Sequence, residues 1–149
     1  MENIKIEATA KTPQIDFNHL TGELVLSGKS IPENAAKLYE GVFYWVKDYA
    51  ERPNKLTNFR LNLEYFNTSS TMWIGRIIKV LSHITLPDAT LMIHLYFDIN
   101  DFESMDSEEI TDAISPIIDM AGTPTVNVGI KIYGTDDDGQ ILKETIAFI

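Results

Sequence analysis

The stretch Tyr65-Phe66-Asn67-Thr68-Ser69-Ser70 marks the point where a strand ends and a helix begins. Before it, residues 58–66 alternate apolar and polar side chains, which is the pattern of a strand with one buried face. After it, aliphatic residues recur at helical spacing: Ile74, Ile77, Ile78, Leu81 and Ile84. A strand that leads into an amphipathic helix in this way favours a layered α/β fold.

The residues at this junction have two interpretations. Asn, Thr and Ser are common at helix starts, because their side-chain oxygens accept hydrogen bonds from otherwise unpaired amides. Capping explains any one of these residues, but it does not require the run of hydroxyls from Thr68 to Thr71. Such a run also offers a kinase several acceptors at the positive end of a helix.

The segments on either side complete the predicted fold. Short strands near residues 3–9, 15–17 and 24–26 are expected to form a hairpin or meander. A continuous apolar run over residues 90–97 predicts a buried strand, and Asp138-Gly139 lies between two strand-like runs, which predicts a hairpin. We expect one α/β domain over residues 1–149, with a mixed sheet of about five to seven strands, three main helices and a C-terminal hairpin.

A second helix start is predicted at Ser30-Ile31-Pro32-Glu33. Ser30 and Glu33 have the spacing of a capping box, in which each side chain bonds the other's backbone amide, and Pro is tolerated in a first helical turn. With Asn34, these residues are expected to cap a helix that lies near the same end of the sheet as the hydroxyl run. Ser30, Glu33 and Asn34 are therefore candidates for the same partner-binding surface as the hydroxyl run.

Composition excludes several classes of partner. The chain of 149 residues carries a net charge of −10, which disfavours nucleic acid and anionic membrane surfaces. No apolar run is long enough to cross a bilayer, and residues 1–5 lack a signal-peptide core. We therefore expect a cytoplasmic location and no membrane insertion. The absence of cysteine excludes disulfides and thiolate metal sites.

The sequence contains no recognised catalytic motif, so we expect no enzyme activity and no cofactor. His94 lies in an apolar run and is expected to be a hydrogen-bonded core histidine rather than a catalytic base. The acidic segment 98–109 matches no calcium loop and is expected to form a solvated loop and a first helical turn, with no metal site. The alternative is a small-molecule or metal-binding domain that uses this segment, with Asp98, Asp101 and His94. A third possibility is an oligomer built through the C-terminal hairpin.

Three sequence pieces together resemble the SiaC-like family of bacterial regulatory phosphoproteins. They are Thr12-Pro13-Gln14-Ile15-Asp16-Phe17, then Ser30-Ile31-Pro32-Glu33-Asn34, then Leu63-Glu64-Tyr65-Phe66-Asn67-Thr68-Ser69-Ser70. The resemblance extends over roughly residues 12–120, and the combination is more specific than any single piece. It implies a STAS-like fold, similar to anti-sigma-factor antagonists, with a phosphorylatable hydroxyl at a helix start.

The resemblance also implies a function in partner switching and cyclic di-GMP signalling, as in the control of biofilms. A kinase and a phosphatase would act on Thr68, with Ser69 and Ser70 as alternates, and the unphosphorylated form would bind and activate a diguanylate cyclase. The expected partner-binding residues at the helix start are Asn67, Ser69, Ser70, Ser30, Glu33 and Asn34. The chain departs from the family at Trp73-Ile74-Gly75-Arg76 and in its second C-terminal strand, 140–148. These departures concern the partner more than the fold.

Overall fold

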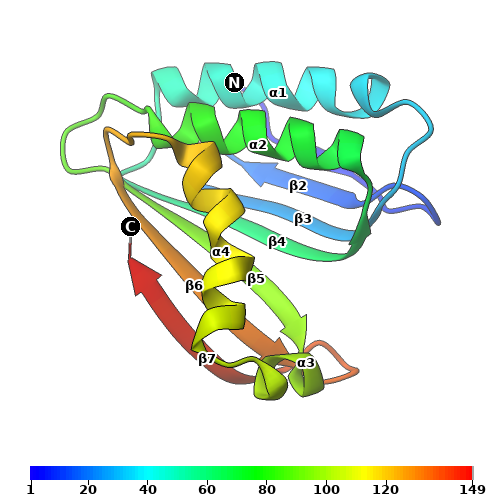
Figure 1. Ribbon diagram of the computed structural model, residues 1–149. Coiled ribbons are helices and arrows are strands. Elements are labelled where there is room, and N and C mark those ends of the chain that lie inside the picture. Colours follow the sequence, from blue (N-terminus) through cyan, green and yellow to red (C-terminus); the bar gives the residue numbers. More distant parts are fainter. Residues whose placement is uncertain (149) are drawn as a thin grey trace.

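Within residues 1–148, which the computed structural model describes, seven strands form one sheet (Figure 1). Their order across the sheet is the same as their order along the chain. The strands are β1 (Ile4–Ile6), β2 (Gln14–Asn18), β3 (Glu23–Ser30), β4 (Leu56–Phe66), β5 (Thr90–Asp98), β6 (Asn127–Thr135) and β7 (Ile141–Phe148). The prediction of a sheet of five to seven strands is confirmed at its upper limit.

The sheet is mixed, as predicted. The first three strands pair antiparallel as a meander, β3 to β6 are parallel, and β6 and β7 form an antiparallel hairpin. The hairpin turn is held by Asp136, whose Oδ1 accepts hydrogen bonds from the amides of Asp138 and Gln140, both at 2.9 Å. Gly139 takes the positive φ of 80° that such a turn requires. Oligomerisation through this hairpin stays a prediction.

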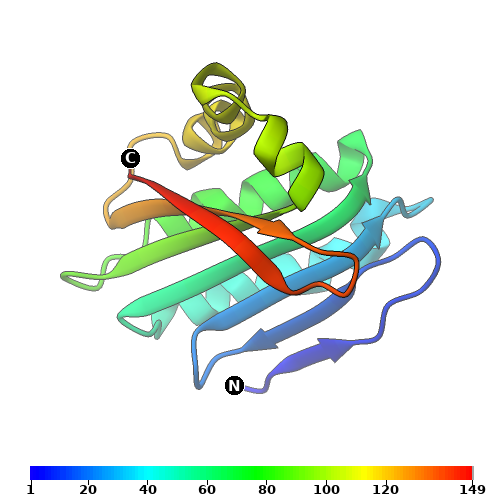
Figure 2. The same ribbon diagram turned by 90° about the horizontal axis from the view of Figure 1, so that it is seen from below.

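The helices cover one face of the sheet. Within the described range they are α1 (Ala35–Glu51), α2 (Thr68–Ser82), α3 (Ile99–Ser104) and α4 (Ser107–Ala121). Each lies between two neighbouring parallel strands that step across the sheet in one direction, so right-handed crossovers place them all on the same side. Figure 2, seen from below, shows the other face without helices. None of the helices in residues 1–148 is long and apolar enough to span a bilayer.

A single hydrophobic core fills the space between the helices and the sheet. Phe17, Phe59, Ile93 and Ile130 lie on the helix-covered side of four strands and are fully buried. Phe59 lies opposite Ile93 on the neighbouring strand, and Ile93 lies opposite Ile130. Their side chains point to the same side of the sheet, because alternate residues of a strand face the same side. The prediction that residues 90–97 form a buried strand is confirmed.

His94 belongs to the structure of the sheet. Its Nδ1 lies 2.6 Å from the hydroxyl of Tyr133, its Nε2 lies 2.7 Å from Oδ1 of Asn58, and the side chain is buried. Burial, followed by the charge of Arg60, lowers the pKa of His94 to about 4, so the ring is neutral at physiological pH. The expectation of a hydrogen-bonded core histidine is confirmed.

The predicted capping box at Ser30 and Glu33 is wrong. Ser30 is the last residue of β3, where it registers with Phe66 of β4, and its side chain is fully buried. The helix begins later, at Ala35, and its N-cap is Asn34. Parallel pairing therefore extends the strand into residues that locally resemble a helix start, and Glu33 instead pairs with Lys11 at 3.3 Å on the surface.

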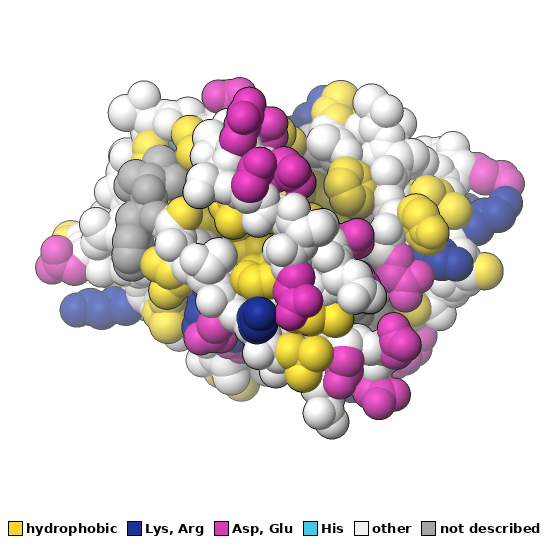
Figure 3. All heavy atoms as spheres, turned by 60° about the horizontal axis from the view of Figure 1, so that its bottom comes forward, with side chains coloured by type: hydrophobic (Ala, Val, Ile, Leu, Met, Phe, Trp, Pro, Cys, Tyr) yellow, Lys and Arg dark blue, Asp and Glu magenta, His cyan; other side chains and the backbone are white. Residues whose placement is uncertain are grey.

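The acidic segment 98–109 contains more helix than expected. Asp98 caps α3 by accepting a hydrogen bond from the amide of Asn100 at 2.9 Å, and Asp106 caps α4 through the amide of Glu109 at 2.8 Å. The short helix α3 packs against β6 at Gly134, where a Cβ would come within 2.8 Å of Ile99 Cδ1. Acidic side chains are widespread on the side of the molecule in Figure 3, in keeping with the net charge of −10.

Candidate functional site

The start of α2 is fixed by Asn67, as the sequence predicts. Its Oδ1 accepts a hydrogen bond from the amide of Ser70 at 2.9 Å, which is the geometry of an N-cap. Its own amide donates to the carbonyl oxygen of Ser30 at 2.9 Å, and its Nδ2 donates to that of Pro32 at 3.3 Å. One side chain thus joins the end of β3, the following loop and the first turn of α2.

The hydroxyls that follow Asn67 have different environments. Thr68 and Ser69 are exposed, whereas Ser70 is fully buried. The Oγ of Ser70 donates to the carbonyl oxygen of Ser30 at 2.9 Å, and Thr71 Oγ1 donates to that of Asn67 at 3.2 Å. In the folded chain Ser70 is out of reach of a kinase, so its alternate role as an acceptor conflicts with its burial. Thr68 and Ser69 stay accessible.

The buried hydroxyl cluster consists of Ser30, Tyr39 and Ser70, from β3, α1 and α2. Ser30 Oγ lies 2.5 Å from Tyr39 Oη and donates to Ser70 Oγ at 2.8 Å. Burial raises the pKa of Tyr39, against the lowering effect of its hydrogen bonds to Ser30 and Ser70, so the phenol remains protonated. Because buried hydroxyls are costly without partners, this cluster holds the two helix starts together.

No sequence pattern predicts that Tyr39 belongs to this cluster. The available signal was the residue type, because a buried Tyr normally needs a partner for its hydroxyl. The partner itself lies nine residues away, in Ser30, and the third member is 40 residues from Ser30. Spacing along the chain does not reveal such a contact.

Large exposed apolar side chains precede and follow Thr68 along the chain, and another follows the end of the neighbouring strand β3. Tyr65 is 64% exposed and Phe66 57% exposed at the end of β4, and Met72, one helical turn after Thr68, is 51% exposed. Ile31 directly follows Ser30, which is the register partner of Phe66. A group of exposed apolar side chains at one end of a domain is typical of a protein-binding surface.

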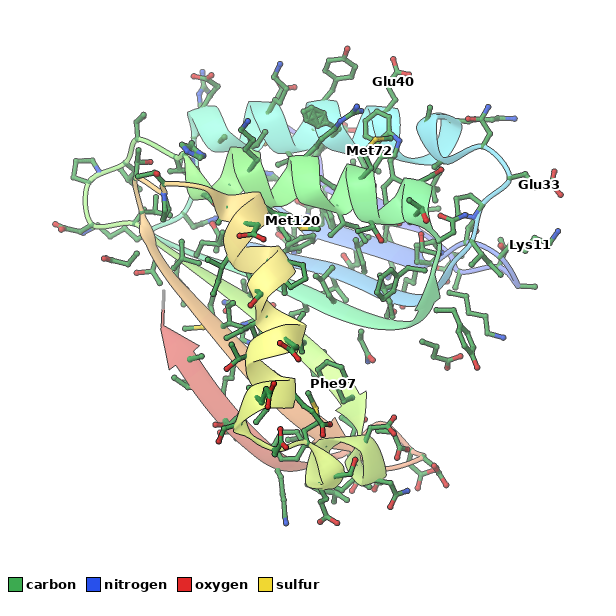
Figure 4. The ribbon with its side chains drawn as sticks, in the orientation of Figure 1. Lys11, Glu33, Glu40, Met72, Phe97 and Met120 are labelled. Carbon is green, nitrogen blue, oxygen red and sulfur yellow. The ribbon has the colours of Figure 1, made fainter. Side chains whose placement is uncertain are left out.

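A groove of about 520 Å³, here called the α2–α4 groove, begins at Thr68. It is lined by Thr68, Thr71, Met72, Gly75, Arg76, Lys79, Asp119, Met120 and Gly122. Figure 4 shows Met120 on α4 beside α2. Its Cγ would lie 3.4 Å from a Cβ at position 75, so Gly75 allows the two helices to approach closely. The candidate phosphorylation site therefore borders a partly apolar groove.

A second cavity, of about 610 Å³, lies at the carboxyl ends of β4, β5 and β6. Asp98 and Asp101 line it, but His94 does not, since both its ring nitrogens face Tyr133 and Asn58. The structure thus does not bring together the residues of the alternative small-molecule or metal site. Among residues 1–148, no group of three or more His, Asp or Glu side chains is arranged to hold a metal ion.

A mixed sheet with helices on one face, and an exposed hydroxyl run at the start of α2, define a small single-sheet α/β domain as the class of this protein. The model of the SiaC family of regulatory phosphoproteins matches residues 6–124. The chain therefore belongs to this family, and the resemblance found in the sequence is confirmed.

Solved structures of SiaC from Pseudomonas aeruginosa have the same fold. Apo-SiaC is 22% identical, with a TM-score of 0.66, and the match covers 86% of this chain and 98% of that one. SiaC in complex with the diguanylate cyclase SiaD, which it activates, also has 22% identity and a TM-score of 0.66, over 84% and 97% of the two chains. An uncharacterized protein of P. aeruginosa strain UCBPP-PA14 is 28% identical over 66% of this chain and 78% of its own length.

Proposed function

We propose that this protein is a non-catalytic, phosphorylation-switched regulator whose unphosphorylated form binds and controls a diguanylate cyclase in the cytoplasm. A Ser/Thr kinase and a phosphatase would act on Thr68. Membership of a family of regulatory phosphoproteins supports the switch, and the complex of the P. aeruginosa relative with SiaD supports the choice of partner. Ser69 is the alternate acceptor, because it is the other exposed hydroxyl of the first turn.

The observation that carries the proposal is the exposed Thr68 on a rigidly held helix start among exposed apolar side chains. A phosphate there adds a charge of about −1.5 to −2. The helix dipole tolerates a negative charge at this end, so the fold has no reason to change. The cost falls on a partner, which would have to bury that charge against Tyr65, Phe66 or Met72.

The experiment begins with mass spectrometry of the protein isolated from its own cells, which should find phosphate on Thr68. Thr68→Ala and Thr68→Asp chains then serve as baits, with Ser69→Ala as the matched control. Thr68→Ala should retain a diguanylate cyclase and Thr68→Asp should lose it, while Ser69→Ala should behave like the parent. Phosphate found only elsewhere, or equal retention by both Thr68 variants, would contradict the switch.

A further inference from the structure

We propose that the α2–α4 groove is the docking site for an acidic amphipathic helix of the partner. This inference deepens the proposed function, on which it rests, by naming the surface that Thr68 controls and the chemistry of the segment it receives. It is carried by the shape of the groove, the charge of its rim and the position of Thr68 at its end.

The shape fits a short helix. From Thr68 to Lys79, α2 rises about 16 Å, which is the length of about three helical turns. Met72 and Met120 supply flexible apolar contacts, and Met120 can lie close to α2 because Gly75 has no side chain. An amphipathic helix laid into an apolar groove is a recurring mode of recognition, and methionine adapts well to such a partner.

The charge of the rim selects the partner. Arg76 and Lys79 are both exposed along α2, and the opposing acidic residue of the groove is Asp119. The groove is thus locally positive on a protein whose net charge is −10. An acidic segment would be attracted here and repelled by most of the remaining surface. This charge pattern would raise the association rate and favour binding at the groove over binding elsewhere.

Arg76 is already positioned for such a contact. Its Cζ lies 4.6 Å from the ring centroid of Trp73, and its Nη2 lies 3.9 Å from the sulfur of Met72. Stacking on an aromatic ring restrains the guanidinium before binding, which reduces the entropy lost in a complex.

Phosphorylation of Thr68 would reverse the sign of the net charge that lines the groove. Before modification, the two cations outweigh Asp119. A phosphate on Thr68 contributes about −1.5 to −2 and makes the groove negative overall. The same acidic helix would then meet repulsion at its entrance, with no movement of α2 required.

The first test measures the affinity of the cyclase retained by the Thr68→Ala chain, after its purification. Arg76→Glu and Lys79→Glu together, in that background, should weaken binding about tenfold or more. The matched control is a chain with Lys55→Glu and Arg52→Glu, which makes the same charge change at exposed positions beside the other end of the sheet. The control should change affinity by less than about twofold, as expected for charges outside an interface. Equal losses in both chains would overturn the groove as the docking site.

The second test locates the contact by photo-crosslinking. A photoreactive residue at Met72 should crosslink to a segment whose acidic and apolar residues alternate at helical spacing, and one at Leu20, which is 72% exposed, should not. Crosslinks from Leu20 alone, or to a segment without acidic residues, would contradict the inference. If Thr68→Asp prevents binding but the groove variants do not, the groove fails and the switch stands. The opposite pattern would support the groove and contradict the switch, and a chain that retains no cyclase counts against both.

Discussion

The helices α1 and α2 start at the carboxyl ends of neighbouring strands, and both starts have an Asn cap but different sequences after it. Asn34 accepts a hydrogen bond from the amide of Lys37 at 3.2 Å, and Asn67 accepts one from that of Ser70 at 2.9 Å. Both helices follow parallel strands, β3 and β4, so they begin at the same, carboxyl-terminal end of the sheet. After the cap, α1 continues with two alanines and α2 with Thr68 and Ser69. Since α1 begins without hydroxyls, the hydroxyls of α2 are not needed to start a helix.

The comparison also separates the hydroxyls of α2 from one another. Lys37 and Ser70 occupy equivalent positions, three residues after each cap, but Lys37 is exposed and Ser70 is buried against Ser30. Ser70 therefore has a structural role that Lys37 lacks. Thr68 and Ser69 are left as the surface residues that distinguish the two helix starts.

The largest expected effect is on partner binding. Thr68→Asp should weaken binding of the cyclase about tenfold to a hundredfold, because an acidic partner segment meets a like charge. Ala36→Asp places the same charge in the first turn of α1 and should change the affinity by less than about twofold. Titration calorimetry on the two purified variants provides the measurement. A similar loss for Ala36→Asp would show that the helix starts are not distinguished by the partner.

A smaller effect is expected on stability. Ser70→Ala should lower the free energy of unfolding by about 1–3 kcal/mol, since Ser30 and Tyr39 lose a buried hydrogen-bond partner. Lys37→Ala, at the equivalent position of α1, should change it by less than about 0.5 kcal/mol. Denaturant titration followed by Trp fluorescence measures both. If Ser70→Ala is neutral, the buried hydroxyl cluster does not hold the helix starts together.

Removing the two N-caps should give a smaller difference in stability between the two helix starts. Asn34→Ala and Asn67→Ala should each cost about 0.5–2 kcal/mol, the usual range for a lost N-cap. The loss should be greater for Asn67, because its Nδ2 also bonds the carbonyl of Pro32. Thermal unfolding of the two variants gives the comparison, and a greater loss for Asn34 would contradict it.

The smallest expected effect is at Glu33. Glu33→Gln removes an ion pair with Lys11 in which the two side chains are 89% and 61% exposed, so stability should change by less than about 0.5 kcal/mol. The same denaturant titration applies. A loss near that of Asn34→Ala would instead mean that Glu33 takes part in capping α1.

The fold was largely predictable because most strands and the long helices carry a local apolar pattern, either periodic or, in β5, continuous. Local pattern failed where a distant contact decides the structure. Ser30 has the local sequence of a cap, but its pairing with β4 keeps it in a strand. The helix α3 is too short for a periodic pattern, and it depends on the missing side chain of Gly134. For the site, Asn67 could be predicted from residue type, whereas the burial of Ser70 depends on Ser30 and Tyr39 from other elements.

The agreement between strand order and chain order has a consequence for synthesis on the ribosome. Because β1 to β7 pair in sequence, each new strand can join an edge that is already present, and none has to insert between two others. Chains emerge from the N-terminus, and early segments can fold first. Ser30, Tyr39, Asn67 and Ser70 all precede β5, so the residues that hold Thr68 have emerged before the last three strands. The end of the molecule that carries Thr68 can therefore assemble early in translation.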